Sequence, residues 1–111
     1  MNSEQLMAWA AGLLDGCGTL YITIEQGPTR EYHAITLQVA PSDAKGVERM
    51  IIASGNGGPS RTFPELNVWE LRGIEAIRGF LAEVWPLLLP ETRSRFNHEI
   101  KRYRALKQIA S

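Results

Sequence analysis

The sequence has little from which to build cross-links, metal centres or a membrane anchor. It holds one cysteine and two histidines in 111 residues, so no internal disulfide can form and a structural zinc site would lack ligands. The longest apolar run, Trp85–Pro90, is far shorter than the roughly 20 residues of a membrane helix. The chain opens with Glu4 in place of a basic cluster, so no secretory signal is expected. These absences predict a protein of the cytoplasm or an organellar matrix that makes no membrane contact.

The sequence also lacks an excess of charge of either sign. Its 12 Lys and Arg residues offset its 12 Asp and Glu residues, whereas nucleic-acid-binding domains are typically basic. Acidic residues predominate up to residue 60 and basic residues predominate after it, many of them between 93 and 107. A basic run on a helix is commonly just a solvated surface, so the run alone predicts no partner.

What is present fits one globular domain spanning 1–111. Hydrophobic residues make up 44% of the chain and charged residues 22%, close to globular averages. Apolar spacing and turn residues predict, in order, a helix at 4–16, strands at 19–25 and 32–39, a helix at 43–53, strands at 60–63 and 66–71, and helices at 74–88 and 92–109. Breaks are expected at 26–29, 55–59 and 64–65. The pattern is an α+β fold of αββαββα(α) order.

The predicted strands alternate apolar and polar residues with a period of two. One face of the sheet is therefore polar, which predicts an antiparallel four-stranded sheet with helices on one face and the other face free. Hydroxyl, amide and aromatic groups suit base edges in a DNA groove, although an ordinary solvent-facing sheet would have a similar composition. The candidate DNA contacts on this face, at its hairpin turn and on the flanking last helix are Thr19, Tyr21, Thr23, Glu25, Gln26, Arg30, Tyr32, Thr36, Gln38, Arg61, Val68, Glu70 and Arg93.

Residues 10–18 read Ala-Ala-Gly-Leu-Leu-Asp-Gly-Cys-Gly. This segment resembles the Leu-Ala-Gly-Leu-Ile-Asp-Ala-Asp-Gly signature of the LAGLIDADG homing endonucleases. Six positions agree in residue type, and the element order and length agree with a single-motif subunit over nearly the whole chain. The resemblance implies an intron-encoded, magnesium-dependent nuclease that cuts double-stranded DNA at a specific site with its sheets in the major groove.

Small residues recur every four positions along the first predicted helix, at Ala8, Gly12 and Gly16, and Ala11 widens the stripe. Such a stripe lets two helix backbones approach closely, which favours dispersion and Cα–H···O contacts. The resemblance implies that two motif helices pack side by side in a two-fold homodimer on a pseudo-palindromic DNA site. The interface would then contain Ala8, Ala11, Gly12, Asp15 and Gly16.

The chain departs from the family at the position that carries the chemistry. The resemblance implies an acid at the penultimate motif position, which holds Mg²⁺ together with a neighbouring backbone carbonyl. Cys17 stands there, next to Gly16; a thiol is neutral near pH 7 and a thiolate is too soft for magnesium. Asp15 is the nearest substitute ligand. The polar residue that the resemblance implies near the end of the second strand falls at Pro41, and the lysine that it implies just before the last helix falls near Glu91. Cleavage is therefore predicted to be weak or lost, and an inactive protein would need no cofactor.

Three functions remain open. The first is the homodimeric DNA-binding protein of homing-endonuclease type described above. The second keeps the fold without cutting, as a DNA- or RNA-binding module that serves transcription or splicing. The third is a domain that binds a small molecule or a protein through its sheet, for which Glu25 and Glu70 on the outer face would be better suited.

Overall fold

The computed structural model describes residues 2–55 and 60–110. The elements are α1 (Ser3–Cys17), β1 (Thr19–Gln26), β2 (Glu31–Val39), α2 (Ala44–Ala53), β3 (Ser60–Phe63), the 3₁₀ turn η1 (Pro64–Leu66), β4 (Val68–Arg72), α3 (Ile74–Val84), the 3₁₀ turn η2 (Trp85–Leu87) and α4 (Pro90–Ala110). The predicted α+β class and element order are confirmed. Of the break predicted at 55–59, positions 56–59 lie outside the described residues; Gly55 follows α2 with φ +94°.

The ends of α1 have clear local causes. The Asn2 side chain accepts from the backbone N–H of Gln5, and the Gln5 side chain accepts from the backbone N–H of Asn2, which together form a capping box. At the other end, a Cβ on Gly18 would lie 2.7 Å from the Leu14 carbonyl oxygen and 2.9 Å from its Cα. Only glycine fits where the chain turns so closely from α1 into β1.

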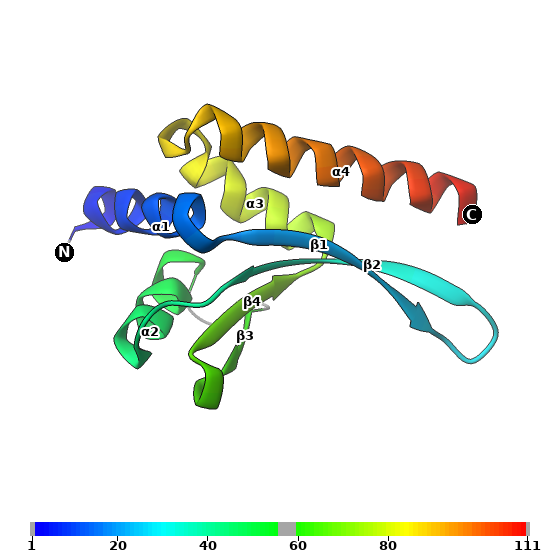
Figure 1. Ribbon diagram of the computed structural model, residues 1–111, viewed down its shortest axis with the longest axis horizontal. Helices are drawn as coiled ribbons and strands as arrows, with labels where there is room; N and C mark the ends of the chain where they lie inside the picture. Colours follow the sequence, from blue (N-terminus) through cyan, green and yellow to red (C-terminus); the bar gives the residue numbers. More distant parts are fainter. Residues whose placement is uncertain (1, 56–59, 111) are drawn as a thin grey trace.

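The four strands form one antiparallel sheet in the order β1-β2-β4-β3. β1 and β2 make a long hairpin that extends past α1 and α3, with α4 running above it (Figure 1). In the register, Gln38 of β2 pairs with Thr19 of β1 and with Glu70 of β4, and Glu70 in turn pairs with Arg61 of β3. Because side chains alternate along each strand, these paired residues point to the same face.

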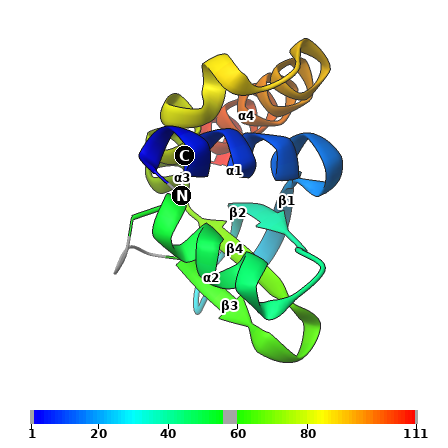
Figure 2. The same cartoon turned by 90° about the vertical axis from the view of Figure 1, so that its left-hand side faces the viewer.

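The helices α1, α3 and α4 lie on one side of the sheet, as Figures 1 and 2 show. The main core fills the space between this helix layer and the sheet, with Trp69, Leu14, Ile35, Leu37 and Phe96 all buried. The opposite face of the sheet has no helix over it within the described residues. Among those residues, no helix combines the length and apolarity that crossing a bilayer requires.

Three boundaries differ from the prediction by more than one residue, and prolines account for most of the difference. The helix predicted at 74–88 ends at Val84. Pro86 has no N–H to continue an α-helix, and the helical conformation is disfavoured for the residue before a proline, here Trp85. The strand predicted at 66–71 runs over 68–72, since Pro64 starts a 3₁₀ turn that closes at Asn67 with φ +49°. The last helix begins at Pro90 rather than at residue 92, with proline in its first turn, where no N–H is needed.

Candidate nucleic-acid interface

The outer face of the sheet brings together most of the predicted DNA contacts. By register and alternation, the rows across it are Thr19–Gln38–Glu70–Arg61, Tyr21–Thr36–Arg72, Thr23–Ala34 and Glu25–Tyr32. Val68 lies at the far end of the same face, opposite Phe63. The predicted set on the strands is thus one contiguous surface, composed mainly of polar side chains.

Glu70 is the centre of this surface. Its carboxylate accepts hydrogen bonds from Arg61 Nη2 at 2.5 Å, Tyr21 Oη at 3.4 Å and Gln38 Nε2 at 3.4 Å. The Glu70 side chain is only 6% exposed, whereas that of Arg61 is 53% exposed. A carboxylate this buried needs such partners, since removing its charge from water without them would be costly.

Glu25 forms a second, more exposed cluster nearer the hairpin tip. Its carboxylate pairs with Arg72 and accepts from Tyr32 Oη at 2.9 Å. Arg72 is absent from the predicted contacts because the sequence places the end of the strand at residue 71. The signal was nevertheless present: Val68, Glu70 and Arg72 are two residues apart, so strand alternation puts all three on one face.

The contacts in these two clusters change the pKa of Glu25, Tyr32 and Tyr21. Hydrogen bonds from Tyr32 and from Arg72 lower the pKa of Glu25 below its ordinary value. The same carboxylate raises the pKa of Tyr32, since it accepts the phenolic hydrogen and disfavours a second negative charge. Burial, followed by the charge of Glu70, raises the pKa of Tyr21. At neutral pH the face therefore carries protonated tyrosines hydrogen-bonded to ionised Glu25 and close to Glu70.

Some predicted contacts are not available as the sequence suggests. Thr36 and Glu70 point to the outer face but are each only 4% exposed, because longer neighbours lie over them. Arg93 is not beside the sheet face at all. It lies on α4, about a sixth of a turn around the helix axis from the buried residue Phe96, and borders a hollow on the outer side of the helix layer.

The hairpin tip carries the remaining predicted contacts. Gln26 donates from Nε2 to Glu31 Oε1 at 2.8 Å, and Arg30 is exposed in the connection between β1 and β2. No partner is recorded for the Arg30 side chain among the described residues. Arg30 is therefore free to meet a phosphate, in contrast to Arg61 and Arg72.

The end of α1 is built from links to distant segments. Asp15 Oδ1 accepts from the Leu89 N–H at 3.1 Å, just before α4 begins. Arg95 Nη2 of α4 donates to the Gly18 carbonyl at 3.2 Å, and Cys17 Sγ lies 3.9 Å from the Ala40 carbonyl. The sequence analysis did not place Arg95 at this corner; the basic residue that it selected on the last helix is Arg93, two residues away.

The donors at this corner do not fit a magnesium ion. Cys17 is exposed but offers sulfur, a poor ligand for a hard cation. The Asp15 carboxylate, predicted as the substitute ligand, already accepts from the Leu89 backbone. Within the described part of the chain, no three His, Cys, Asp or Glu side chains are grouped so that they could hold a metal ion.

One side of α1 is uncovered. Ala8, Gly12 and Gly16 are exposed, and a Cβ added at either glycine would meet nothing within 4 Å. Ala11, predicted to widen this stripe, is instead 1% exposed and packs in the core. Around the helix axis, Ala11 lies roughly 60° from Ala8 and roughly 60° from Leu14, on the side that Ala10 and Leu14 bury.

No protein-family model matches the sequence, and no curated protein matches it closely. Solved structures do match. The I-LtrWI LAGLIDADG homing endonuclease bound to target DNA aligns with a TM-score of 0.69 at 18% identity, covering 96% of this chain and 39% of its own. I-GzeII, a LAGLIDADG homing endonuclease in complex with its DNA target, gives 0.66 at 18% identity, with 97% and 37% covered.

The homing endonuclease I-CvuI in complex with its target in the presence of 2 mM Ca aligns with a TM-score of 0.70 at 17% identity, covering 97% of this chain and 71% of its own. At such identities the likeness shows the fold, and the predicted homing-endonuclease half-domain is confirmed in that sense. The chain spans less than half the length of I-LtrWI and I-GzeII.

Proposed function

We propose that this chain forms a homodimer that binds double-stranded DNA through the outer faces of its two sheets, and that it cleaves DNA weakly or not at all. One observation carries the proposal: the sheet has an uncovered polar face in a fold shared with homing endonucleases that were crystallised on DNA. Arg30 supplies a free cation for phosphate. Gln38 and Arg61 each donate one N–H to Glu70, and their remaining N–H groups supply donors for base edges.

Pairing through α1 is supported by the shape of its exposed side. Ala8, Gly12 and Gly16 form a strip without bulky side chains, so a second copy of the helix could approach backbone to backbone. The I-LtrWI and I-GzeII chains are each more than twice as long as this one, which leaves room for two units of this size. In a dimer, two sheets would together cover a longer stretch of duplex.

Weak or absent cleavage is supported by the donor set at the end of α1. The thiol of Cys17 replaces the acid that the resemblance implies, and Asp15 is bound to the backbone before α4. This observation favours the second candidate, a non-cleaving nucleic-acid-binding module, over an active nuclease. Asp15, Gly16 and Cys17 then serve the structure of the corner rather than a reaction.

Dimerisation is tested by Gly12→Leu, with Gly79→Leu as the matched control. Both glycines are exposed in helices with open space at Cβ, so either change should stabilise the isolated fold by roughly 0.5–1 kcal/mol. We expect Gly12→Leu alone to convert the dimer to a monomer in sedimentation velocity experiments. A wild-type chain that stays monomeric at high concentration, or an unchanged Gly12→Leu dimer, would contradict the proposal.

Cleavage is tested by Cys17→Asp, with Cys17→Ser as the control. The duplex would be one selected by the wild-type protein from a randomised library, so that binding is measured first. We expect tight binding by all three proteins and no nicking by wild type or Cys17→Ser in magnesium. Magnesium-dependent nicking by Cys17→Asp alone would identify a nuclease damaged at one position, whereas inertness would support a binding module. Failure to select any duplex would overturn the proposed function.

A further inference from the structure

The positive charge of the molecule is concentrated away from the sheet. Helix α4 carries six of the chain's 12 Lys and Arg residues but only two of its 12 Asp and Glu residues. The rest of the chain is therefore acidic overall. Since the sheet face pairs its arginines with glutamates, the strongest attraction for an anionic polymer lies on the helix layer.

The basic residues of α4 do not all have the same surroundings. Arg102 pairs with Glu99, Arg95 donates to Gly18, and Lys107 lies over the ring of Tyr103. For Arg93, Lys101 and Arg104, no ion pair or hydrogen bond is recorded within the described part of the chain. These three cations are free to bind a ligand.

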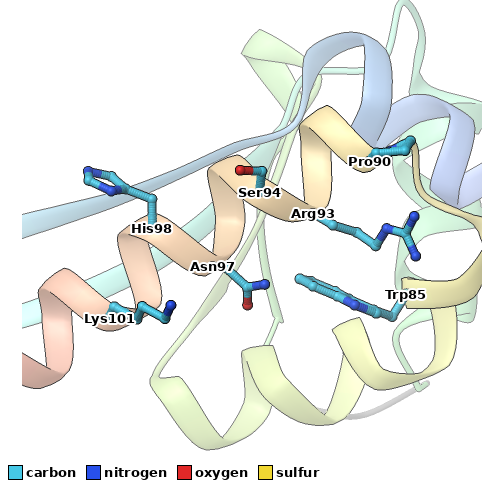
Figure 3. A pocket seen from close by; sticks show the side chains of 7 residues that line it. All are labelled: Trp85, Pro90, Arg93, Ser94, Asn97, His98 and Lys101. Carbon is cyan, nitrogen blue, oxygen red and sulfur yellow. The ribbon is translucent and has the colours of Figure 1, made fainter.

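The three free cations share one side of the helix with Asn97. At 100° per residue, the centre of this side lies roughly 100° around the helix from the buried residues Phe96 and Tyr103. A hollow of about 570 Å³ opens there between α4 and η2, lined by Trp85, Arg93, Asn97 and Lys101 among others. Figure 3 shows Arg93 and Asn97 extending from α4 on the side of Trp85, with Lys101 further along the helix.

Trp85 gives the hollow a second kind of contact. Its indole is half-buried against the core, which fixes the ring while part of it still lines the hollow. Asn97, which also borders the neighbouring groove with Trp85, offers an amide donor and an acceptor. Aromatic, amide and cationic groups together match an unpaired base with its phosphates, whereas a simple polyanion would need only the cations.

We propose that the hollow beside Trp85 binds single-stranded nucleic acid, with a base stacked on Trp85 and phosphates held by Arg93 and Lys101. A paired duplex does not fit this role, because its bases are stacked on one another and cannot cover the indole. The site lies on the outer side of the helix layer, whereas the proposed duplex surface is on the sheet. The two sites are therefore independent, and each can fail without the other.

The test measures fluorescence anisotropy with a labelled single-stranded RNA of about ten nucleotides, the equivalent single-stranded DNA, and inorganic polyphosphate. Trp85→Leu should weaken RNA binding by roughly fivefold or more while leaving polyphosphate binding unchanged, and Trp85→Phe should restore RNA binding. Lys101→Glu should weaken the binding of both RNA and polyphosphate by at least roughly fivefold. The matched control Lys45→Glu, at an exposed lysine on α2, should change neither by more than about twofold.

Three outcomes would overturn the proposal: wild-type protein that binds no single strand, a Trp85→Leu variant with unchanged RNA affinity, or equal losses in Lys101→Glu and Lys45→Glu. Duplex affinity is measured on the same variants. We expect it to be unchanged in Trp85→Leu and Lys101→Glu, and a parallel loss would mean that the helix face belongs to the duplex site. Absent duplex binding with intact RNA binding would overturn only the proposed function.

Discussion

The outer face of the sheet and the outer side of α4 both carry basic side chains, but those on the sheet are paired with carboxylates and several of those on α4 are not. On the sheet face, Arg61 and Arg72 each pair with a glutamate. On the outer side of α4, Arg93, Lys101 and Arg104 have no recorded ion pair among the described residues. A formal net charge of zero therefore conceals one face that is neutralised internally and another that is openly basic.

Burial explains the difference. The Glu70 side chain is 6% exposed, so its charge has lost most of its water and depends on Arg61, Tyr21 and Gln38. Of the unpaired cations of α4, Lys101 and Arg104 are exposed and Arg93 is half-buried, so their charges keep water and cost little unpaired. Pairing on the sheet is thus a requirement of the fold, while the free charges on α4 are not needed for folding and are available for binding.

The greatest difference expected between the two faces is in their contribution to stability. Replacing Arg61 with Met removes the shortest hydrogen bond to Glu70 and should lower the free energy of unfolding by about 1–2 kcal/mol, less than for a fully buried pair because Arg61 is half exposed. Arg104→Met, the same change on α4, should stay within about 0.5 kcal/mol. Urea denaturation measures both. Equal effects would show that the two faces do not differ in this way.

A smaller effect is expected on duplex affinity. Glu70→Gln keeps the shape of the side chain but leaves one acceptor oxygen in place of two, and it removes the ion pair with Arg61. We expect several-fold tighter duplex binding and a salt dependence steeper by about one unit per protomer, as one more cation meets a phosphate. Single-strand binding at α4 should not change. An unchanged duplex affinity would mean that Arg61 does not face the DNA.

The smallest effect is on titration near the hairpin tip. Glu25→Gln should lower the pKa of Tyr32 toward its ordinary value near 10, because the charged acceptor is lost. Tyr21, which faces Glu70, is the internal control. Tyrosinate absorbance during an alkaline titration follows all three tyrosines of the chain, and the difference between wild type and Glu25→Gln reports Tyr32. An unshifted Tyr32 in the variant would show that the two side chains do not interact in solution.

The same pair links stability to pH in two windows. The folded-state pKa of Tyr32 is raised, so its contribution is complete below the unfolded value near 10 and is lost as pH rises through the folded pKa. The folded-state pKa of Glu25 is lowered, so its contribution is present above the unfolded value near 4.3 and is lost as pH falls through the folded pKa. Both declines should be absent from Glu25→Gln.

Local pattern was enough to predict the fold and the composition of the sheet face. Alternation placed Tyr21, Gln38 and Glu70 together, and glycine spacing located the uncovered side of α1. What the sequence did not predict depends on distant contacts. The burial of Ala11 follows from how α1 packs on its neighbours, and the pairing of Glu25 with Arg72 joins residues 47 positions apart.

The corner at the end of α1 shows the same limit. The bond from Leu89 to Asp15 joins residues 74 positions apart, and the register of α4 that selects Arg95 over Arg93 depends on where Pro90 starts the helix. A carboxylate in a motif suggests chemistry when only its neighbours in sequence are known. The structural role of Asp15 depends on the position of the segment before α4, whose backbone N–H at Leu89 it accepts.

The links between the first and last helices also have a mechanical consequence. Asp15 reaches from α1 to the backbone before α4, and Arg95 reaches back from α4 to the residue after α1. These two hydrogen bonds run in opposite directions between the helices, so a rotation of one helix relative to the other would stretch at least one of them. The two bonds therefore restrain the angle between α1 and α4.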